Sequence, residues 1–205
     1  MKLHTRIMFG MFVLLLFFIP NSAFAQEALS EGNRGPAVLD LQEKLKGMGY
    51  FTDQATGYFG PVTSNAVQQF QRDTGISPTG VFGNQTQQKL HNIEMIAKVV
   101  NGEARGEAYV GKVAVAAVIL NRIEDPEFPA NVHDVIFQSN AFTAVHDGQY
   151  NLTPNGYAYQ AVIDALKGWD PTQGSVYYYN PTIATDDWIF TRETVLRIGN
   201  HLFAK

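Results

Sequence analysis

The sequence has no cysteine among its 205 residues. That absence excludes a disulfide framework, a thiolate nucleophile and a cysteine-ligated zinc site. Basic runs are also missing, and 15 basic residues stand against 19 acidic ones, a balance that disfavours nucleic-acid binding. The apolar stretch at residues 7–19 is shorter than the roughly 20 residues that a membrane-spanning helix needs. We therefore expect neither a nucleic-acid partner nor an integral membrane span in the mature chain.

The first 25 residues have the features of a secretory signal peptide. Lys2 and Arg6 precede the apolar stretch, and Ala23-Phe24-Ala25 provides a small-x-small cleavage site. An uncleaved membrane anchor is the alternative. Cleavage after Ala25 removes both basic residues and no acidic one, so the formal charge falls from −4 to −6. We predict that residues 26–205 are exported and that, without disulfides, their hydrophobic core holds them together.

Residues 56–63 and 79–86 share the pattern Thr-Gly-x-Phe-Gly-x-x-Thr, and a helical pattern follows each copy. Glycine tolerates the positive φ of a turn, so each Thr-Gly pair predicts a turn before a helix. We expect Phe59 and Phe82 to be buried. Thr63 and Thr86 lie near the helix starts, where a hydroxyl can cap free N–H groups. With the amphipathic segment around Leu41, the pattern predicts three short helices.

This part of the chain resembles the peptidoglycan-binding domain type 1, whose two motifs fall at residues 32–45 and 57–71. The resemblance implies a compact three-helix module over residues 26–91 that binds peptidoglycan glycan strands. The family commonly has Asp before each Gly-x-Phe-Gly, whereas this chain has Thr56 and Thr79. The polar contacts at those two turns therefore stay open.

Glu103 stands where a solvated carboxylate is unexpected. Ile96 and Val100 recur at helical spacing, and Glu103 lies on the same apolar face, seven residues after Ile96. Residues 110–120 are almost continuously apolar and predict a buried helix. Burial between two core helices would raise the pKa of Glu103 and keep it protonated near neutral pH, as a general acid requires. The alternative is a surface turn on which Glu103 caps the backbone or pairs with Arg105.

The remainder of residues 92–205 predicts a second, mainly helical domain. Residues 157–166 have a helical pattern, and residues 176–181, with three consecutive tyrosines, are the one strongly β-prone run. The spacing of Val195, Ile198, His201 and Leu202 suggests a last helical turn. The histidines do not have the spacing of a zinc site and H-E-x-x-H is absent, so we expect no metal and no cofactor.

Several stretches together resemble the SleB-type spore cortex-lytic enzymes. They are residues 99–122 (VVNGEARGEAYVGKVAVAAVILNR), 137–148 (FQSNAFTAVHDG), 168–171 (GWDP), 177–181 (YYYNP) and 198–205 (IGNHLFAK). The resemblance implies a mainly α, α+β fold, with the three-helix peptidoglycan-binding module followed by a lysozyme-like catalytic domain. It also implies a lytic transglycosylase that cleaves spore cortex peptidoglycan containing muramic δ-lactam during germination, outside the inner spore membrane. Glu103 would be its catalytic acid, and a companion spore membrane protein its partner.

The chemistry of a lytic transglycosylase needs one carboxylate. Ordinary glycosidases use two carboxyl groups about 5 to 10 Å apart, but a transglycosylase closes a 1,6-anhydro ring with the sugar's own C6 hydroxyl and positions no water. We interpret Glu107 as structural, because it precedes the buried helix, where an acidic side chain is favourable. If Asp147 lies across the cleft, the enzyme could instead be a hydrolase.

The polar and aromatic residues after the buried helix supply candidate glycan contacts. Sugar rings pack on aromatic faces, and their hydroxyl and N-acetyl groups need hydrogen-bond partners. The candidates are Phe142, Thr143, Tyr177, Tyr179 and Asn180. Alternate tyrosines of a strand can equally face the core.

Three rival functions remain open at this stage. The first is a zinc-dependent N-acetylmuramoyl-L-alanine amidase, the second a muramidase-type hydrolase of vegetative cell wall, and the third a wall-binding protein without catalysis.

Overall fold

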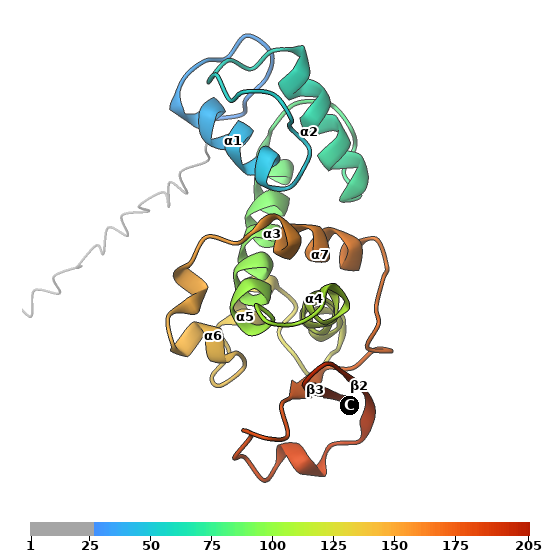
Figure 1. Ribbon diagram of the computed structural model, residues 1–205. Coiled ribbons are helices and arrows are strands. Elements are labelled where there is room, and N and C mark those ends of the chain that lie inside the picture. The colour runs from blue at the N-terminus through green and yellow to red at the C-terminus, as the bar shows by residue number, and fades with distance from the viewer. Residues whose placement is uncertain (1–26) are drawn as a thin grey trace, which may run out of the picture.

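The computed structural model describes residues 27–205, so the predicted signal peptide lies outside the described residues. The first part contains α1 (Pro36–Gly47), α2 (Pro61–Asp73) and α3 (Asn84–Glu103). The second contains α4 (Tyr109–Glu124), α5 (Val132–Ile136), α6 (Thr143–His146), η1 (Gln149–Asn151), α7 (Gly156–Leu166), β1 (Tyr177–Tyr179), η2 (Ile189–Thr191), β2 (Thr194–Ile198) and β3 (His201–Ala204). The fold is mainly helical with one small sheet, as predicted (Figure 1). No described helix is long and apolar enough to cross a bilayer.

The first sequence repeat is organised around a buried glutamine. Nε2 of Gln42 donates to the carbonyl oxygen of Tyr58 at 2.9 Å and to Oγ1 of Thr63 at 2.8 Å. Its Oε1 accepts from the backbone N–H groups of Thr56 and Gly57, both at 2.9 Å. One side chain of α1 therefore fixes the turn that leads into α2.

The second repeat uses Gln71 of α2 in the same way. Its Nε2 donates to the carbonyl oxygen of Val81 and to Oγ1 of Thr86, both at 2.9 Å, and its Oε1 accepts from the N–H of Gly80 at 3.0 Å. Thr63 and Thr86 thus accept hydrogen bonds from glutamine side chains, and neither α2 nor α3 has a side-chain cap. The expectation that these hydroxyls cap helices was wrong, because the N-cap positions are Gly60 and Gly83 and both threonines lie within the helices.

Thr56 and Thr79 close the two turns that the family commonly builds with Asp. Oγ1 of Thr56 accepts from the N–H of Tyr58, and Oγ1 of Thr79 accepts from the N–H of Val81, both at 3.2 Å. A hydroxyl that accepts from the backbone two residues later makes the same kind of turn as an Asp carboxylate. The departure from the family pattern therefore leaves the turn geometry intact.

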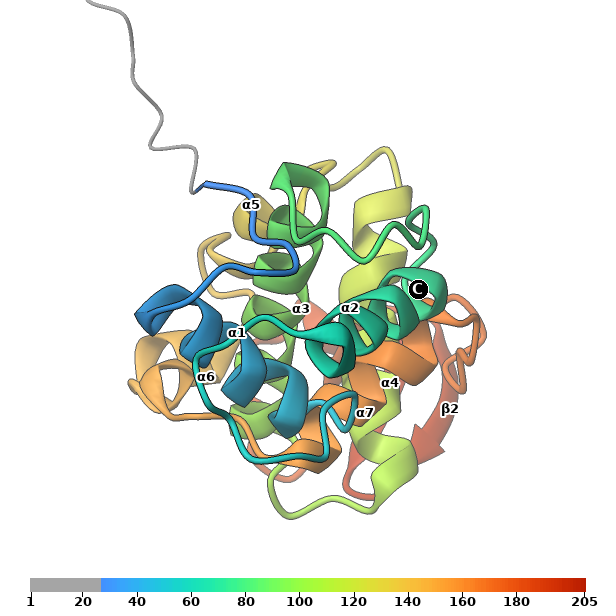
Figure 2. The same cartoon turned by 90° about the horizontal axis from the view of Figure 1, so that it is seen from above.

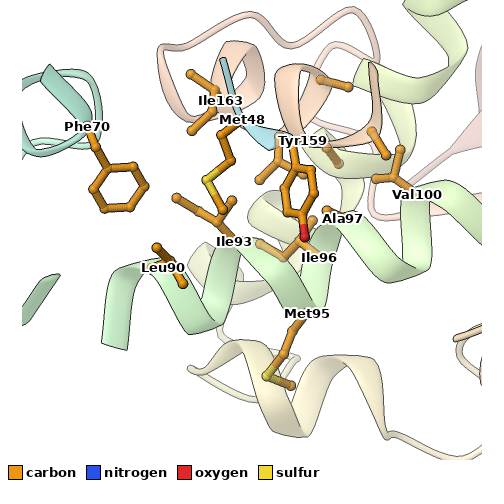
Figure 3. Packing of buried hydrophobic residues seen from close by; sticks show 14 of the residues in the cluster. Met48, Phe70, Leu90, Ile93, Met95, Ile96, Ala97, Val100, Tyr159 and Ile163 are labelled. Carbon is orange, nitrogen blue, oxygen red and sulfur yellow. The ribbon is translucent and has the colours of Figure 1, made fainter. Parts of the chain in front are cut away.

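Helix α3 runs through both parts of the molecule, and the predicted boundary between residues 91 and 92 falls inside it (Figure 1). Met48 and Phe70 from the first part and Tyr159 and Ile163 of α7 pack around its apolar side (Figure 3). Seen from above, α2 lies over α7 (Figure 2), and an ion pair of 2.7 Å between Lys167 and Asp73 joins their ends. The two parts therefore share one continuous hydrophobic core.

The C-terminal segment forms an antiparallel sheet with strand order β1-β3-β2. Ile198 pairs with His201, and Gly199, with φ of 57°, begins the two-residue turn between β2 and β3. The expected last helical turn was therefore wrong. Spacings of three and four residues suit a helix, but a Gly-Asn pair between two β-prone runs favours a hairpin. Phe203 of β3 packs the sheet against Ala114 and Val118 of α4.

Candidate active site

Glu103 is the last residue of α3, which agrees with the prediction that one core helix ends there. Its Oε1 accepts a 2.6 Å hydrogen bond from the backbone N–H of Ala144 in α6. A Cβ atom on Gly102 would collide with the Cβ of Ala144. Glycine at position 102 therefore lets α6 lie against the end of α3, so that its backbone reaches the carboxyl group.

Burial raises the pKa of Glu103 above its ordinary value of 4.5. The Ala144 hydrogen bond, the Tyr178 hydroxyl and the charge of His201 each lower this pKa, and Asp147 raises it slightly. Burial outweighs the other effects, because removing a carboxylate from water penalises its charged form. The surface-turn alternative was wrong, since Glu103 is partly buried at a helix end and has no ion pair with Arg105 within the described residues.

Glu103 lines a cavity of about 990 Å³. One side is formed by the ends of α3 and α4 and by α6, and the other by β1 and the loop that follows it. The predicted residues Thr143, Tyr177, Tyr179 and Asn180 all line it. The volume is within the range of sites that enclose small-molecule ligands, about 300–1,000 Å³.

Phe142 does not line the cavity and is a correction to the prediction. Its ring is 2% exposed and belongs to the hydrophobic core. The Arg122 guanidinium covers it at 5.1 Å from the ring centroid, and Tyr178 lies beside it at 6.5 Å between centroids. Phe142 is therefore behind the cavity wall, and the next residue, Thr143, reaches the cavity.

Tyr178 is a site residue that strand alternation alone does not reveal, because it is the tyrosine expected to face the core. Its ring does pack there, stacked on Phe203 at 5.8 Å. Its hydroxyl is buried near Glu103 and makes no hydrogen bond of ordinary geometry. Burial and the Glu103 carboxylate raise the pKa of Tyr178 well above its ordinary value. The phenol therefore keeps its proton beside the acid and is available as a donor.

Arg122 is a second residue that the sequence did not single out. It is 6% exposed, yet it lines the cavity and forms no ion pair with any carboxylate of residues 27–205. Its Nε donates to the carbonyl oxygen of Val176 at 2.7 Å, and the rings of Phe128 and Tyr177 flank the guanidinium. Burial lowers the pKa of Arg122. An unpaired cation at the wall suits a substrate group that offers oxygen acceptors.

The remaining carboxylates are not arranged as a second catalytic group. Asp147 is exposed and outside the cavity lining, and its carboxylate accepts from the N–H of Gln149 at 3.0 Å and from Nε2 at 2.6 Å. These hydrogen bonds lower the pKa of Asp147. Glu127 and Asp186 do line the cavity, but neither is among the groups that shift the pKa of Glu103. Both of these side chains are exposed, whereas Glu103 is partly buried and held by its hydrogen bond to α6.

The loop after β1 adds aromatic residues to the outer wall. Trp188 contacts the edge of Tyr177 at 5.2 Å between centroids, and the guanidinium of Arg192 lies 4.6 Å from the indole. Trp188 is 47% exposed, while Ile183, which also lines the cavity, is 75% exposed.

Within residues 27–205, no three His, Cys, Asp or Glu side chains gather in an arrangement that could hold a metal ion.

Two family models match the chain: a putative peptidoglycan binding domain over residues 34–90 and a cell wall hydrolase over residues 106–204. The second begins after Glu103, so the role of this residue depends on the site geometry. A spore cortex-lytic enzyme of Bacillus cereus is 38% identical over 228 residues, covering 89% of this chain and 88% of the relative. One from Oceanobacillus iheyensis is 34% identical, with 89% of each chain covered.

A solved structure gives the same result for the second part of the chain. It is the catalytic domain of the germination-specific lytic transglycosylase SleB from Bacillus anthracis. The identity is 56% and the TM-score 0.54, over 56% of this chain and 93% of that one. The similarity therefore extends over both the helical module and the part that contains the cavity.

Proposed function

The chain belongs to the spore cortex-lytic enzyme family, and from this premise we propose that it is a lytic transglycosylase of spore cortex peptidoglycan. Glu103 is the catalytic residue of the proposal. The observation that supports it best is a partly buried carboxyl group, its pKa raised by burial, in the wall of a cavity of about 990 Å³. A protonated carboxylic acid at neutral pH is what the cleavage of a glycosidic bond first requires.

In the proposed reaction, Glu103 first acts as an acid. Its proton passes to the glycosidic oxygen between muramic acid and N-acetylglucosamine, the C1–O bond breaks, and positive charge develops at C1 of the muramic sugar. The carboxylate that remains then accepts the proton of the C6 hydroxyl of the same sugar, and the C6 oxygen bonds to C1. The products are a free hydroxyl on the departing N-acetylglucosamine, which keeps the donated proton, and a 1,6-anhydro muramic sugar, whose former C6 hydroxyl proton restores the acid form of Glu103.

The neighbours of Glu103 fit both halves of this cycle. Burial favours the acid form, while the Ala144 N–H, the Tyr178 hydroxyl and His201 stabilise the carboxylate once the proton has left. Opposing influences of this kind keep the proton affinity in the range where one group can donate and reclaim it. Thr143, Tyr179 and Asn180 offer polar groups to the hydroxyl and N-acetyl groups of the glycan, and Tyr177 offers a ring face.

A retaining or inverting hydrolase is the second candidate function. The observation in its favour is that the charge of Asp147 raises the pKa of Glu103. Its exposure and its hydrogen bonds to Gln149 argue for the first candidate. Mass spectrometry of fragments released from isolated cortex separates them, because a transglycosylase leaves anhydro ends and a hydrolase leaves reducing ends.

Replacement of the acid tests the residue assignment. Glu103→Gln keeps the size of the side chain and should abolish release of fragments while the variant still binds sacculi through residues 27–90. Asp147→Asn is the matched control and should retain activity. Full activity of Glu103→Gln would refute the proposal.

We also propose that residues 26–205 act outside the cell that makes them, after cleavage at Ala25. N-terminal sequencing of the protein recovered from spores tests this point, since a mature chain that begins at Gln26 is expected. A chain that retains residues 1–25 would contradict it.

A further inference from the structure

Glu107 occupies a narrow slot between two glycines. Its side chain is 10% exposed. A Cβ atom on Gly111 would lie 2.9 Å from the Cβ of Glu107, and one on Gly199 would collide with Glu107 Oε2. Gly111 belongs to α4 and Gly199 to the turn between β2 and β3. The carboxylate therefore reaches the hairpin only because both positions lack a side chain.

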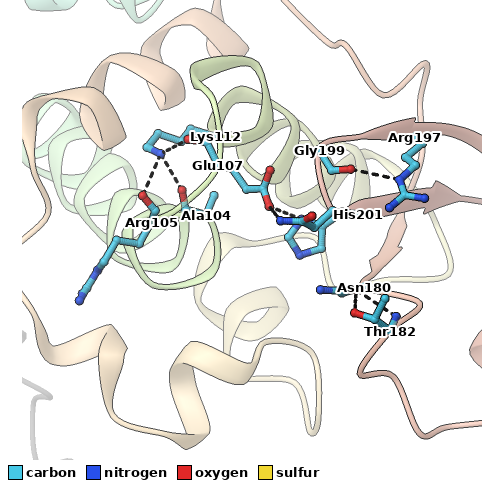
Figure 4. Close-up of polar contacts among 10 residues, drawn as sticks. Ala104, Arg105, Glu107, Lys112, Asn180, Thr182, Arg197, Gly199 and His201 are labelled. Carbon is cyan, nitrogen blue, oxygen red and sulfur yellow. Dashed lines mark hydrogen bonds and ion pairs between the residues drawn. The ribbon is translucent and has the colours of Figure 1, made fainter.

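The Glu107 carboxylate joins the α3–α4 connection to the start of β3 (Figure 4). Its Oε1 accepts from Nδ2 of Asn200 at 3.1 Å and lies 3.6 Å from Nδ1 of His201. On the other side, its backbone carbonyl accepts from Nζ of Lys112 at 2.7 Å. Glu107 is thus fixed from behind and holds two consecutive residues of the hairpin.

His201 lines the same cavity as Glu103. Its side chain is 15% exposed, and the Tyr178 ring packs edge-on against the imidazole, with 5.4 Å between the ring centroids. The Glu107 carboxylate lies on the Nδ1 side of the ring. A carboxylate that lies beside one nitrogen of an imidazole fixes the direction of the ring.

We propose that Glu107 is a positioning residue, which holds His201 at the cavity wall so that the imidazole ring stabilises the carboxylate of Glu103 after proton donation. This inference rests on the proposed function, in which Glu103 is the acid. It assigns a role to the second glutamate of the 101–107 stretch and to the Gly199-Asn200-His201 turn, which the reaction itself leaves unexplained.

Titratable groups from three parts of the fold lie around the His201 ring. They are Glu103 from α3, Glu107 from the α3–α4 connection and Tyr178 from β1. Arg197 of β2 directs its Nε to the carbonyl oxygen of Gly199 at 3.1 Å. Glu107 contacts His201 at 3.6 Å, and His201 lines the cavity with Glu103, so the contact between Glu107 and the acid is indirect.

The test compares Glu107→Gln, His201→Gln and the double variant on soluble glycan fragments from cortex. Each single variant should lower kcat by up to about 100-fold, the loss that misplacement of a group by about 1 Å can cause, with little change in KM. The double variant should be no worse than the poorer single variant, because both remove one coupled unit. The alkaline limb of the pH–activity profile, which reports the proton on Glu103, should move to higher pH in both.

The pair His133 and Asp134 provides matched controls. His133 Nδ1 lies 2.9 Å from Asp134 Oδ1, both side chains are well exposed, and neither lines the cavity. His133→Gln and Asp134→Asn should leave kcat and the pH profile unchanged. If Glu107→Gln does not fold, as judged by circular dichroism and Tm, His201→Gln alone decides the result.

Two outcomes would overturn the inference. One is a kcat within about twofold of wild type in a folded His201→Gln variant. The other is an unshifted alkaline limb together with additive losses in the double variant, which would indicate a structural role. Glu103→Gln is measured alongside: if it is inactive while the His201 and Glu107 variants behave as wild type, only the inference fails, and if it is active, the proposed function fails.

Discussion

The backbone N–H of Ala144 points at Oε1 of Glu103 from 2.6 Å, and glycine at position 102 is what makes this approach possible. A main-chain donor, rather than another side chain, makes this hydrogen bond. The donor has no titratable proton of its own, so the pH dependence of the interaction comes from Glu103 alone.

Gly102→Ala should therefore disable the site more than its size suggests. The added methyl group collides with the Cβ of Ala144 and must displace α6, which weakens the hydrogen bond to Glu103. We expect a stability loss of about 1–3 kcal/mol, as for other overpacked cores, and at least a tenfold lower kcat, since one donor to a developing charge contributes about 2.7–4 kcal/mol. Denaturant unfolding and initial rates of fragment release measure the two effects.

Gly106→Ala is the matched control for that variant. Gly106 is exposed, has a negative φ, and no atom lies within 4 Å of the position its Cβ would take. It should keep both stability and kcat. Equal behaviour of the two alanine variants would show that the contact of Gly102 with α6 does not matter.

The raised pKa of Glu103 predicts a particular dependence of stability on pH. The folded carboxyl group binds its proton more tightly than the unfolded one, whose pKa is near 4.5. Its contribution is fully present below that value and is lost as pH rises through the higher folded pKa. Glu103→Gln cannot ionise, so its Tm should match wild type near pH 4 and exceed it near pH 7.

Differential scanning calorimetry of both proteins across that pH range measures this difference. Asp147→Asn provides the opposite case, because hydrogen bonds from Gln149 lower the pKa of Asp147. It should gain nothing at neutral pH. A Glu103→Gln variant that is less stable than wild type at pH 7 would contradict a desolvated acid.

Trp188 should contribute to substrate binding more than to chemistry. It is 47% exposed at the cavity wall and contacts Tyr177. Trp188→Ala is expected to raise KM by up to about tenfold, the equivalent of an aromatic contact of roughly 0.5–1.5 kcal/mol, and to leave kcat unchanged. Trp169→Ala is the matched control, since Trp169 is 44% exposed and lies outside the cavity lining, against Tyr109. Equal KM values in the two variants would remove Trp188 from the binding surface.

Features of the fold that depend on residues close together in the sequence were predictable. The helix that ends at Glu103, the buried helix after it and the two repeats follow from the spacing of apolar residues and glycines, which is local information. Phe59 and Phe82 are buried, as predicted. The Gly199-Asn200 hairpin signal was also present, but a helical spacing of Val195, Ile198 and His201 concealed it.

The environment of Glu103 was not predictable in the same way. Its hydrogen-bond donor is 41 residues away along the chain, and Tyr178 and His201 come from strands near the C-terminus. Such contacts depend on how helices and strands pack, which a single sequence does not specify. Phe142 and Thr143 illustrate the limit, since adjacent residues lie on opposite sides of the cavity wall.

Lys112 should matter to the site without touching the substrate. It is 7% exposed, and its Nζ donates to the carbonyl oxygens of Ala104 at 2.6 Å, Glu107 at 2.7 Å and Arg105 at 3.4 Å. These carbonyls follow the end of α3 and have no helical partner. Lys112→Met removes these charge-assisted hydrogen bonds, although the carbonyl oxygen of Ala104 still accepts from the N–H of Glu107 at 3.2 Å. We therefore expect a stability loss of about 3 kcal/mol, the cost of one or two charged hydrogen bonds, and a lower kcat.

Lys98→Met is the matched control. It removes a partly exposed ion pair of 3.6 Å with Glu94 and a contact with the Tyr150 ring at 5.5 Å from its centroid, and should cost less than about 2 kcal/mol. Equal urea midpoints for the two variants would show that the α3–α4 connection does not need its internal cation.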